Sequence, residues 1–211
     1  MATLRQDVWF GESPRLSGLR LGPFRSAPAR ILLHPHRAAS AANPKLMDFA
    51  EHLADRVEVV LLRPRPAEEA SAAIAQWRDD FVRVIECLDK TWNDRLPLVL
   101  VGVGVGGALA LTLAGHPAAR AAAALAPYVP SQMAWPSVAG EDSRFDPVAL
   151  DKPVLIVAPR AEPRLDRPRL EAAVGRWTKA TWIAPPGTAA AAVAPVWAGT
   201  LAEWALAATR D

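Results

Sequence analysis

Four glycines that interrupt a long apolar stretch, LPLVLVGVGVGGALALTLAGH (residues 96–116), are the strongest chemical signal in the sequence. The valines and leucines before them are typical of a buried strand, and the alanines and leucines after them favour a helix. Glycine also reaches backbone angles that other residues adopt only under strain. The stretch therefore predicts a strand, a tight turn and a helix. The four glycines are Gly102, Gly104, Gly106 and Gly107.

Two alternative interpretations of residues 96–116 are weaker. About twenty uncharged residues are enough to span a bilayer, but four central glycines make a poor transmembrane helix. Gly102, Gly104 and Gly107 also satisfy the dinucleotide-binding pattern G-x-G-x-x-G. That site needs an acid at the end of the next strand to bind the ribose, and the apolar run at residues 121–128 leads into Ala-Pro-Tyr-Val-Pro instead.

The third interpretation is a strand-to-helix elbow of the kind G-x-S-x-G, in which a strained turn exposes a serine nucleophile. Gly102 and Gly106 are then the flanking glycines, and Gly104 stands at the nucleophile position. The backbone N–H of Val105, the first after that position, points from a helix N-terminus and could still bind an anion. The turn is predicted to be present without its nucleophile.

Composition narrows the class of protein. A chain of 211 residues is long enough for one domain, and no linker divides it. The net charge of +2 comes with scattered arginines, which argues against nucleic-acid binding. The lone cysteine, Cys87, excludes an internal disulfide, and the N-terminus has no apolar signal segment. We expect a single cytoplasmic domain over residues 1–211 that uses no cofactor and binds no membrane, with a homodimer left open.

Strands that alternate with helices predict an α/β fold, with a mostly parallel sheet of about eight strands and helices on both faces. A loop of about twenty residues, 129–151, is too short for a cap domain. The strands are expected at residues 7–11, 16–22, 29–33, 57–62, 96–103, 121–128, 153–158 and 181–184, and the helices at 43–56, 67–91, after Gly104, at 166–177 and from 195 onward.

This order of elements, with His34-Pro35-His36 after the first buried strand, resembles the small, lidless bacterial α/β-hydrolases related to dienelactone hydrolases and short esterases. The run from Lys152 to Val157 resembles the strand that precedes the catalytic acid in that family. The resemblance covers residues 33–204. It implies a three-layer α/β-hydrolase sandwich without a cap domain.

The resemblance also implies positions for a catalytic triad. The acid position falls on Glu162 and the nucleophile position on Gly104. The histidine of the family follows a Pro-Gly pair, and here Ala190 stands in its place after Pro186-Gly187. Because neither Gly104 nor Ala190 carries a titratable proton, the usual mechanism cannot run. The leading hypothesis is a non-catalytic pseudohydrolase that binds a small ligand or a protein partner.

An active hydrolase or lyase with nonstandard groups is the alternative. His34 or His36 could act with Glu162 around a surviving amide hole to which Val105 and Pro35 belong. The same three ionisable side chains could instead form a two-histidine, one-carboxylate metal site. The simpler interpretation is that the His-Pro motif only shapes its loop, so we predict no metal.

Arginines follow several strand ends on one edge of the expected sheet. They indicate either an electropositive mouth for a small anion or a rim neutralised by nearby acids. The arginines are Arg37, Arg63, Arg65, Arg160, Arg164 and Arg167, and the acids are Glu68, Glu69, Glu162 and Asp166. We also expect Trp135, beside Met133, to cover a small apolar cavity left at Gly104.

Overall fold

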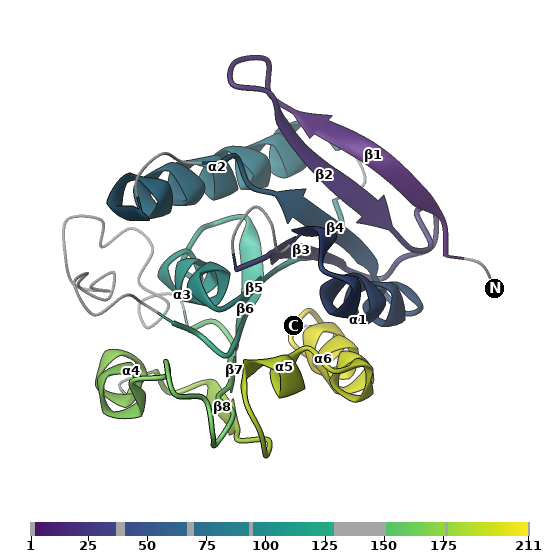
Figure 1. Ribbon diagram of the computed structural model, residues 1–211. Coiled ribbons are helices and arrows are strands. Elements are labelled where there is room, and N and C mark those ends of the chain that lie inside the picture. Colours follow the sequence, from purple (N-terminus) through teal and green to yellow (C-terminus); the bar gives the residue numbers. More distant parts are fainter. Residues whose placement is uncertain are drawn as a thin grey trace.

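The computed structural model describes residues 3–36, 41–66, 70–92, 95–128, 151–175 and 177–210. Eight strands form one sheet in the order β1-β2-β4-β3-β5-β6-β7-β8 (Figure 1). Only the pairs that involve β2 are antiparallel, and all other neighbours run parallel. The predicted α/β fold with a mostly parallel sheet is confirmed, and no cap domain lies among these residues.

The elements follow the predicted order. The strands are β1 (Arg5–Phe10), β2 (Leu16–Leu21), β3 (Arg30–His34), β4 (Glu58–Arg63), β5 (Leu98–Val103), β6 (Ala119–Leu125), β7 (Val154–Val157) and β8 (Ala180–Ile183). The helices are α1 (Pro44–Ala54), α2 (Ala70–Thr91), α3 (Val105–Thr112), α4 (Arg167–Val174), α5 (Ala189–Ala192) and α6 (Pro195–Ala207).

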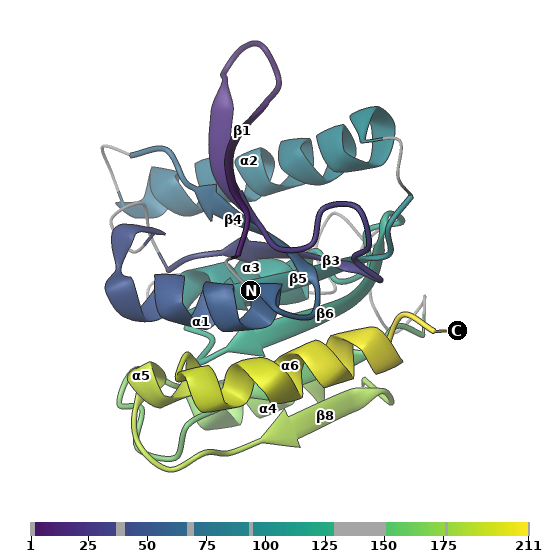
Figure 2. The same ribbon diagram turned by 90° about the vertical axis from the view of Figure 1, so that its right-hand side faces the viewer.

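Helices cover both faces of the sheet because the central strands are apolar on both sides. Side chains of α2, α3 and α4 form one buried cluster with strand residues such as Leu32 and Leu100. Side chains of α1, α5 and α6 form a second cluster with residues such as Leu33 and Val101. Figure 2 shows α1 and α6 side by side over the same face, and the two helices are in contact. The result is a three-layer sandwich.

Strand β6 consists mainly of alanine, which has a low strand propensity. Its position explains this composition, since β6 pairs with β5 and β7 and contacts α3. A Cβ placed on Gly107 of α3 would already lie 3.4 Å from the Cβ of Ala124. Small side chains on both elements therefore let α3 approach the sheet closely.

The ends of two helices are fixed as the sequence predicts. The side chain of Asn43 accepts a hydrogen bond from the N–H of Lys45 before α1, and Asp166 accepts one from Arg169 at the start of α4. Helix α4 ends at Val174 rather than at residue 177. Helix α5 was not expected, because four alanines carry no apolar periodicity.

Candidate functional site

The turn between β5 and α3 has the geometry of a strand-to-helix elbow. Gly104 has φ 58° and ψ −119° and caps the N-terminus of α3. A Cβ on Gly102 would lie 1.9 Å from the carbonyl oxygen of Gly106, and one on Gly106 would lie 2.4 Å from the carbonyl oxygen of His34. Backbone segments therefore meet too closely here for any side chain at the two flanking positions. The predicted strand, turn and helix are confirmed.

The imidazole of His36 lies directly against Gly104. A Cβ on Gly104 would be 2.3 Å from His36 Nδ1, and the N–H of Val105 donates to that same nitrogen at 3.2 Å. The ring also packs at 6.2 Å from the ring of Tyr128. An imidazole therefore occupies the space that a side chain at the nucleophile position would take. The predicted covering residues, Trp135 and Met133, lie outside the described residues.

The predicted amide hole is not formed as expected. The N–H of Val105 is engaged with His36, so it does not face an empty space. Pro35 has no N–H at all, and its carbonyl oxygen accepts a hydrogen bond from Nδ1 of His34 at 2.7 Å. Pro35 therefore offers no N–H to an oxyanion, and its carbonyl oxygen is engaged with His34.

His34 and His36 contact different parts of the molecule. His34 is 1% exposed, with Phe81 and Trp77 of α2 at ring distances of 5.1 Å and 6.3 Å. Burial lowers the pKa of His34 to about 4, so the ring is neutral at pH 7. The tautomers also differ, because Nδ1 of His34 donates whereas Nδ1 of His36 accepts. The two imidazoles therefore do not converge on Glu162.

Glu162 is held by backbone N–H groups. Its Oε2 accepts from the N–H of Ala189 at 2.6 Å, and its Oε1 accepts from the N–H of Arg164 at 3.3 Å. The side chain is 7% exposed. The carboxylate that stands at the acid position thus ties the loop after β7 to the start of α5.

A cavity of about 240 Å³ lies at the carboxyl ends of the parallel strands. It brings together four positions predicted from the sequence, which are His36, Gly104, Glu162 and Ala190. His34, Pro35 and Val105 are not among its lining residues. The remaining lining residues are Asn43, Lys45, Leu46, Val103, Ala126, Tyr128, Arg164, Ala189 and Val193.

Lys45 and Tyr128 line this cavity and were missed by sequence reasoning. Lys45 follows the helix cap Asn43, and α1 begins soon after the His-Pro-His segment. The cap signal located the helix, but only the fold brings the start of α1 next to Gly104. Within the part of the chain that the structure describes, no group of three His, Cys, Asp or Glu side chains is arranged to hold a metal ion.

Most of the arginines expected at this edge are paired. Arg63 forms an ion pair with Asp7 at 2.7 Å, and Arg65 binds Asp80 through two hydrogen bonds of 2.7 and 2.9 Å. Arg167 donates to the carbonyl oxygen of Ala158. Arg164, 3.8 Å from Glu162, is the one arginine among the cavity-lining residues. Arg37 and the acids Glu68 and Glu69 lie outside the described residues.

No protein-family model and no curated protein matches this sequence. Solved structures do match it. A dienelactone hydrolase from Anabaena variabilis has a TM-score of 0.74 at 18% identity, covering 97% of this chain and 97% of that chain. The esterase domain of a Rhodothermus marinus protein has a TM-score of 0.72 at 14% identity, covering 97% and 99%. At these identities the likeness establishes the α/β-hydrolase fold.

Across the described ranges, no helix is both long and apolar enough to cross a membrane.

Proposed function

We propose that this α/β-hydrolase-fold protein is non-catalytic and binds a small ligand in the cavity at the carboxyl ends of its strands. The observation that carries the proposal is the contact between His36 and Gly104. A side chain at position 104 and the present position of the His36 ring exclude one another, because the first side-chain carbon would lie 2.3 Å from Nδ1. This packing supports a site without a nucleophile at position 104.

The acid and histidine positions support the same proposal. Ala190 lines the cavity with a methyl group where the family has an imidazole. Both oxygens of Glu162 accept backbone N–H groups, from Ala189 and Arg164. The carboxylate therefore has a structural task that does not require a partner histidine.

The lining of the cavity indicates the chemistry of the ligand. Leu46, Val103 and Val193 offer apolar contacts, whereas Lys45 and Arg164 place two cations at the same cavity. Glu162 offsets part of this charge, since it lies 3.8 Å from Arg164. A compact apolar molecule with a single anionic group fits this combination.

An active hydrolase or lyase is the second candidate, and one observation favours it. The imidazole of His36 and the carboxylate of Glu162 line the same cavity, as general acid–base chemistry requires. His34 has no part in this candidate, because it is buried against α2. A protein partner, a cytoplasmic location and a homodimer stay predictions.

Turnover of p-nitrophenyl acetate separates the two candidates. We expect the natural protein to hydrolyse the ester no faster than its His36→Ala variant. The triple variant Gly104→Ser, Ala190→His, His36→Ala should gain activity, because His36→Ala clears the space that the serine Cβ needs. Hydrolysis by the natural protein that disappears in His36→Ala would overturn the non-catalytic proposal.

Ligand binding is tested with hexanoate and its neutral analogue hexanamide, using titration calorimetry. We expect hexanoate to bind at least tenfold more tightly, because only hexanoate carries a charge for Lys45 and Arg164. Ala190→Trp should abolish binding by filling the cavity. The matched control Ala172→Trp, on the exposed side of α4, should bind as the natural protein does. Equal affinity of hexanoate for both tryptophan variants would contradict the assignment of the cavity.

A further inference from the structure

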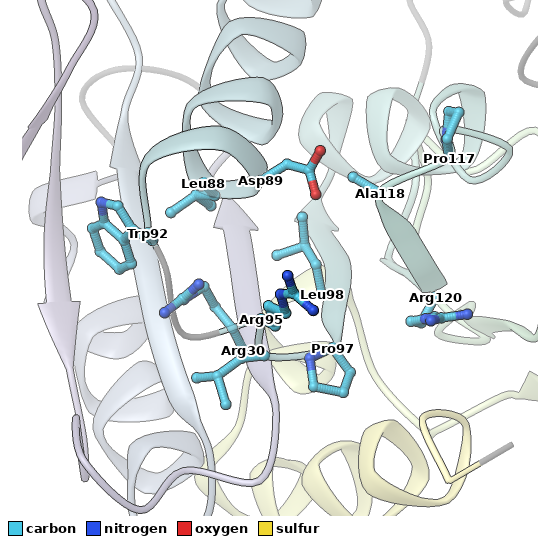
Figure 3. A pocket seen from close by; sticks show the side chains of 11 residues that line it. Arg30, Leu88, Asp89, Trp92, Arg95, Pro97, Leu98, Pro117, Ala118 and Arg120 are labelled. Carbon is cyan, nitrogen blue, oxygen red and sulfur yellow. The ribbon is translucent and has the colours of Figure 1, made fainter.

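A second, larger cavity of about 390 Å³ lies at the opposite edge of the sheet, which the function proposed above does not use. It is formed by the amino ends of β3, β5 and β6 and by the last turn of α2 (Figure 3). The lining residues are Arg30, Leu88, Asp89, Trp92, Arg95, Leu96, Pro97, Leu98, Pro117, Ala118 and Arg120. Its volume falls in the range of small-molecule sites, about 300–1,000 Å³.

One wall of this cavity is fixed by a buried charge cluster. Arg30 is 2% exposed and binds Glu58, which is 0% exposed and also binds Arg20 at 2.5 Å. The guanidinium groups of Arg20 and Arg30 lie 4.5 Å and 4.4 Å from the ring centre of Trp92. Figure 3 shows Arg30 and Trp92 next to each other on one flank of the cavity. This wall holds its shape without a ligand, because each charged group already has partners.

Two further arginines complete the cavity. Arg95 and Arg120 are exposed, and Figure 3 shows Arg95 in the middle of the site and Arg120 on the flank away from Trp92. Among the described lining residues Asp89 is the one acid. Arg95 also has φ 49°, a strained conformation for a residue other than glycine, and such strain is enriched at functional sites.

The charges around this cavity do not cancel. Among the lining residues, the three arginines Arg30, Arg95 and Arg120 stand against one carboxylate, that of Asp89. This leaves a formal excess of two positive charges. The pKa of the neighbouring Lys152 is lowered to about 8, first by burial and second by the positive charge of Arg120.

We propose that this cavity binds a small phosphate-bearing molecule, with Arg95 and Arg120 holding the phosphate against the wall of Arg30 and Trp92. A phosphate monoester carries a charge of about −2 at neutral pH, which matches the excess, and its oxygens suit the fork of a guanidinium group. A stacked aromatic base is disfavoured, because the ring of Trp92 already contacts two guanidinium groups. Pro97 and Pro117 are left to contact the organic part of the ligand.

Titration calorimetry at constant ionic strength tests this site with glycerol 3-phosphate as the probe. Glycerate, a three-carbon carboxylate with one charge, is the comparison compound. We expect glycerol 3-phosphate to bind the natural protein at least tenfold more tightly than glycerate. Equal affinity for the two compounds, or no binding of glycerol 3-phosphate at millimolar concentration, would overturn the proposal.

Variants then locate the binding. Arg95→Gln and Arg120→Gln should each weaken glycerol 3-phosphate binding at least tenfold, with unchanged circular dichroism because both side chains are exposed. Arg56→Gln, a surface arginine paired with Glu203, is the matched control and should bind within twofold of the natural protein. Binding that survives both substitutions, or that falls equally in the control, would refute the site. The Ala190→Trp variant should leave this binding unchanged.

Discussion

The cavities at the carboxyl edge and the amino edge of the sheet, where the parallel strands end and begin, are shaped by different parts of the chain. At the carboxyl edge the geometry is set by backbone, with glycines at 102, 104 and 106 that allow a loop, a strand and a helix to meet. At the amino edge it is set by long charged side chains around Glu58 and Trp92. Backbone packing tolerates no added atom, whereas side chains tolerate exchange but not the loss of a partner charge. The four predictions below test this contrast.

The largest effect is expected at the carboxyl edge, from Gly102→Ala. The added Cβ would lie 1.9 Å from the carbonyl oxygen of Gly106, which is backbone and cannot swing aside. We expect a loss of more than about 4 kcal/mol in the free energy of unfolding, measured by urea denaturation. Gly199→Ala on α6 is the control, since nothing lies within 4 Å of its Cβ position, and it should gain up to about 1 kcal/mol. Similar stabilities of the two variants would show that the elbow is not backbone-limited.

At the amino edge, Glu58→Gln should cost about 3–5 kcal/mol in the free energy of unfolding, because it leaves two arginines without their buried counter-charge. The measurement is again urea denaturation. Glu51→Gln is the matched control, since Glu51 pairs with an exposed Arg5 and should change stability by less than about 1 kcal/mol. A small effect of Glu58→Gln would mean that side-chain charge does not hold this edge together.

Acid should weaken the carboxyl edge through His34. Its folded-state pKa of about 4 is below the ordinary 6.5, so the unfolded chain takes up a proton first as the pH falls. The contribution of the neutral His34 ring to the free energy of unfolding is complete above pH 6.5. It is lost progressively down to pH 4, by up to about 3 kcal/mol. The test is urea denaturation between pH 7 and pH 4.

His34→Gln should flatten this pH dependence, leaving the contribution of His116, whose pKa burial also lowers. His52→Gln is the control at an exposed histidine on α1. An unchanged pH profile in His34→Gln would mean that His34 is not buried in its neutral form.

The smallest effect is expected at Lys152, near the amino edge. Burial is the main cause of its lowered pKa and the charge of Arg120 is the second, so Arg120→Gln should raise the pKa of Lys152 only part of the way back. Arg56→Gln is the control, and the measurement is the pH dependence of the Lys152 side-chain resonances. An unchanged pKa of Lys152 in Arg120→Gln would indicate that the charge of Arg120 does not act on Lys152.

The sequence predicted the features that depend on neighbouring residues. The glycines between residues 102 and 107 placed the strand, the turn and the helix, because backbone freedom is a local property. Asn43 and Asp166 marked helix starts for the same reason. The identities of Gly104 and Ala190, read through the family resemblance, also gave positions that the structure brings to one cavity.

Only the tertiary structure decided where the side chains at the strand ends go. His34 and His36 are two residues apart, yet one packs against α2 and the other against Gly104, because the contacts that orient them come from distant segments. The partners of Glu58 and the lining of both cavities depend likewise on residues far apart in the chain. Local backbone preference is encoded residue by residue, whereas a binding surface exists only after the sheet has set its strands side by side.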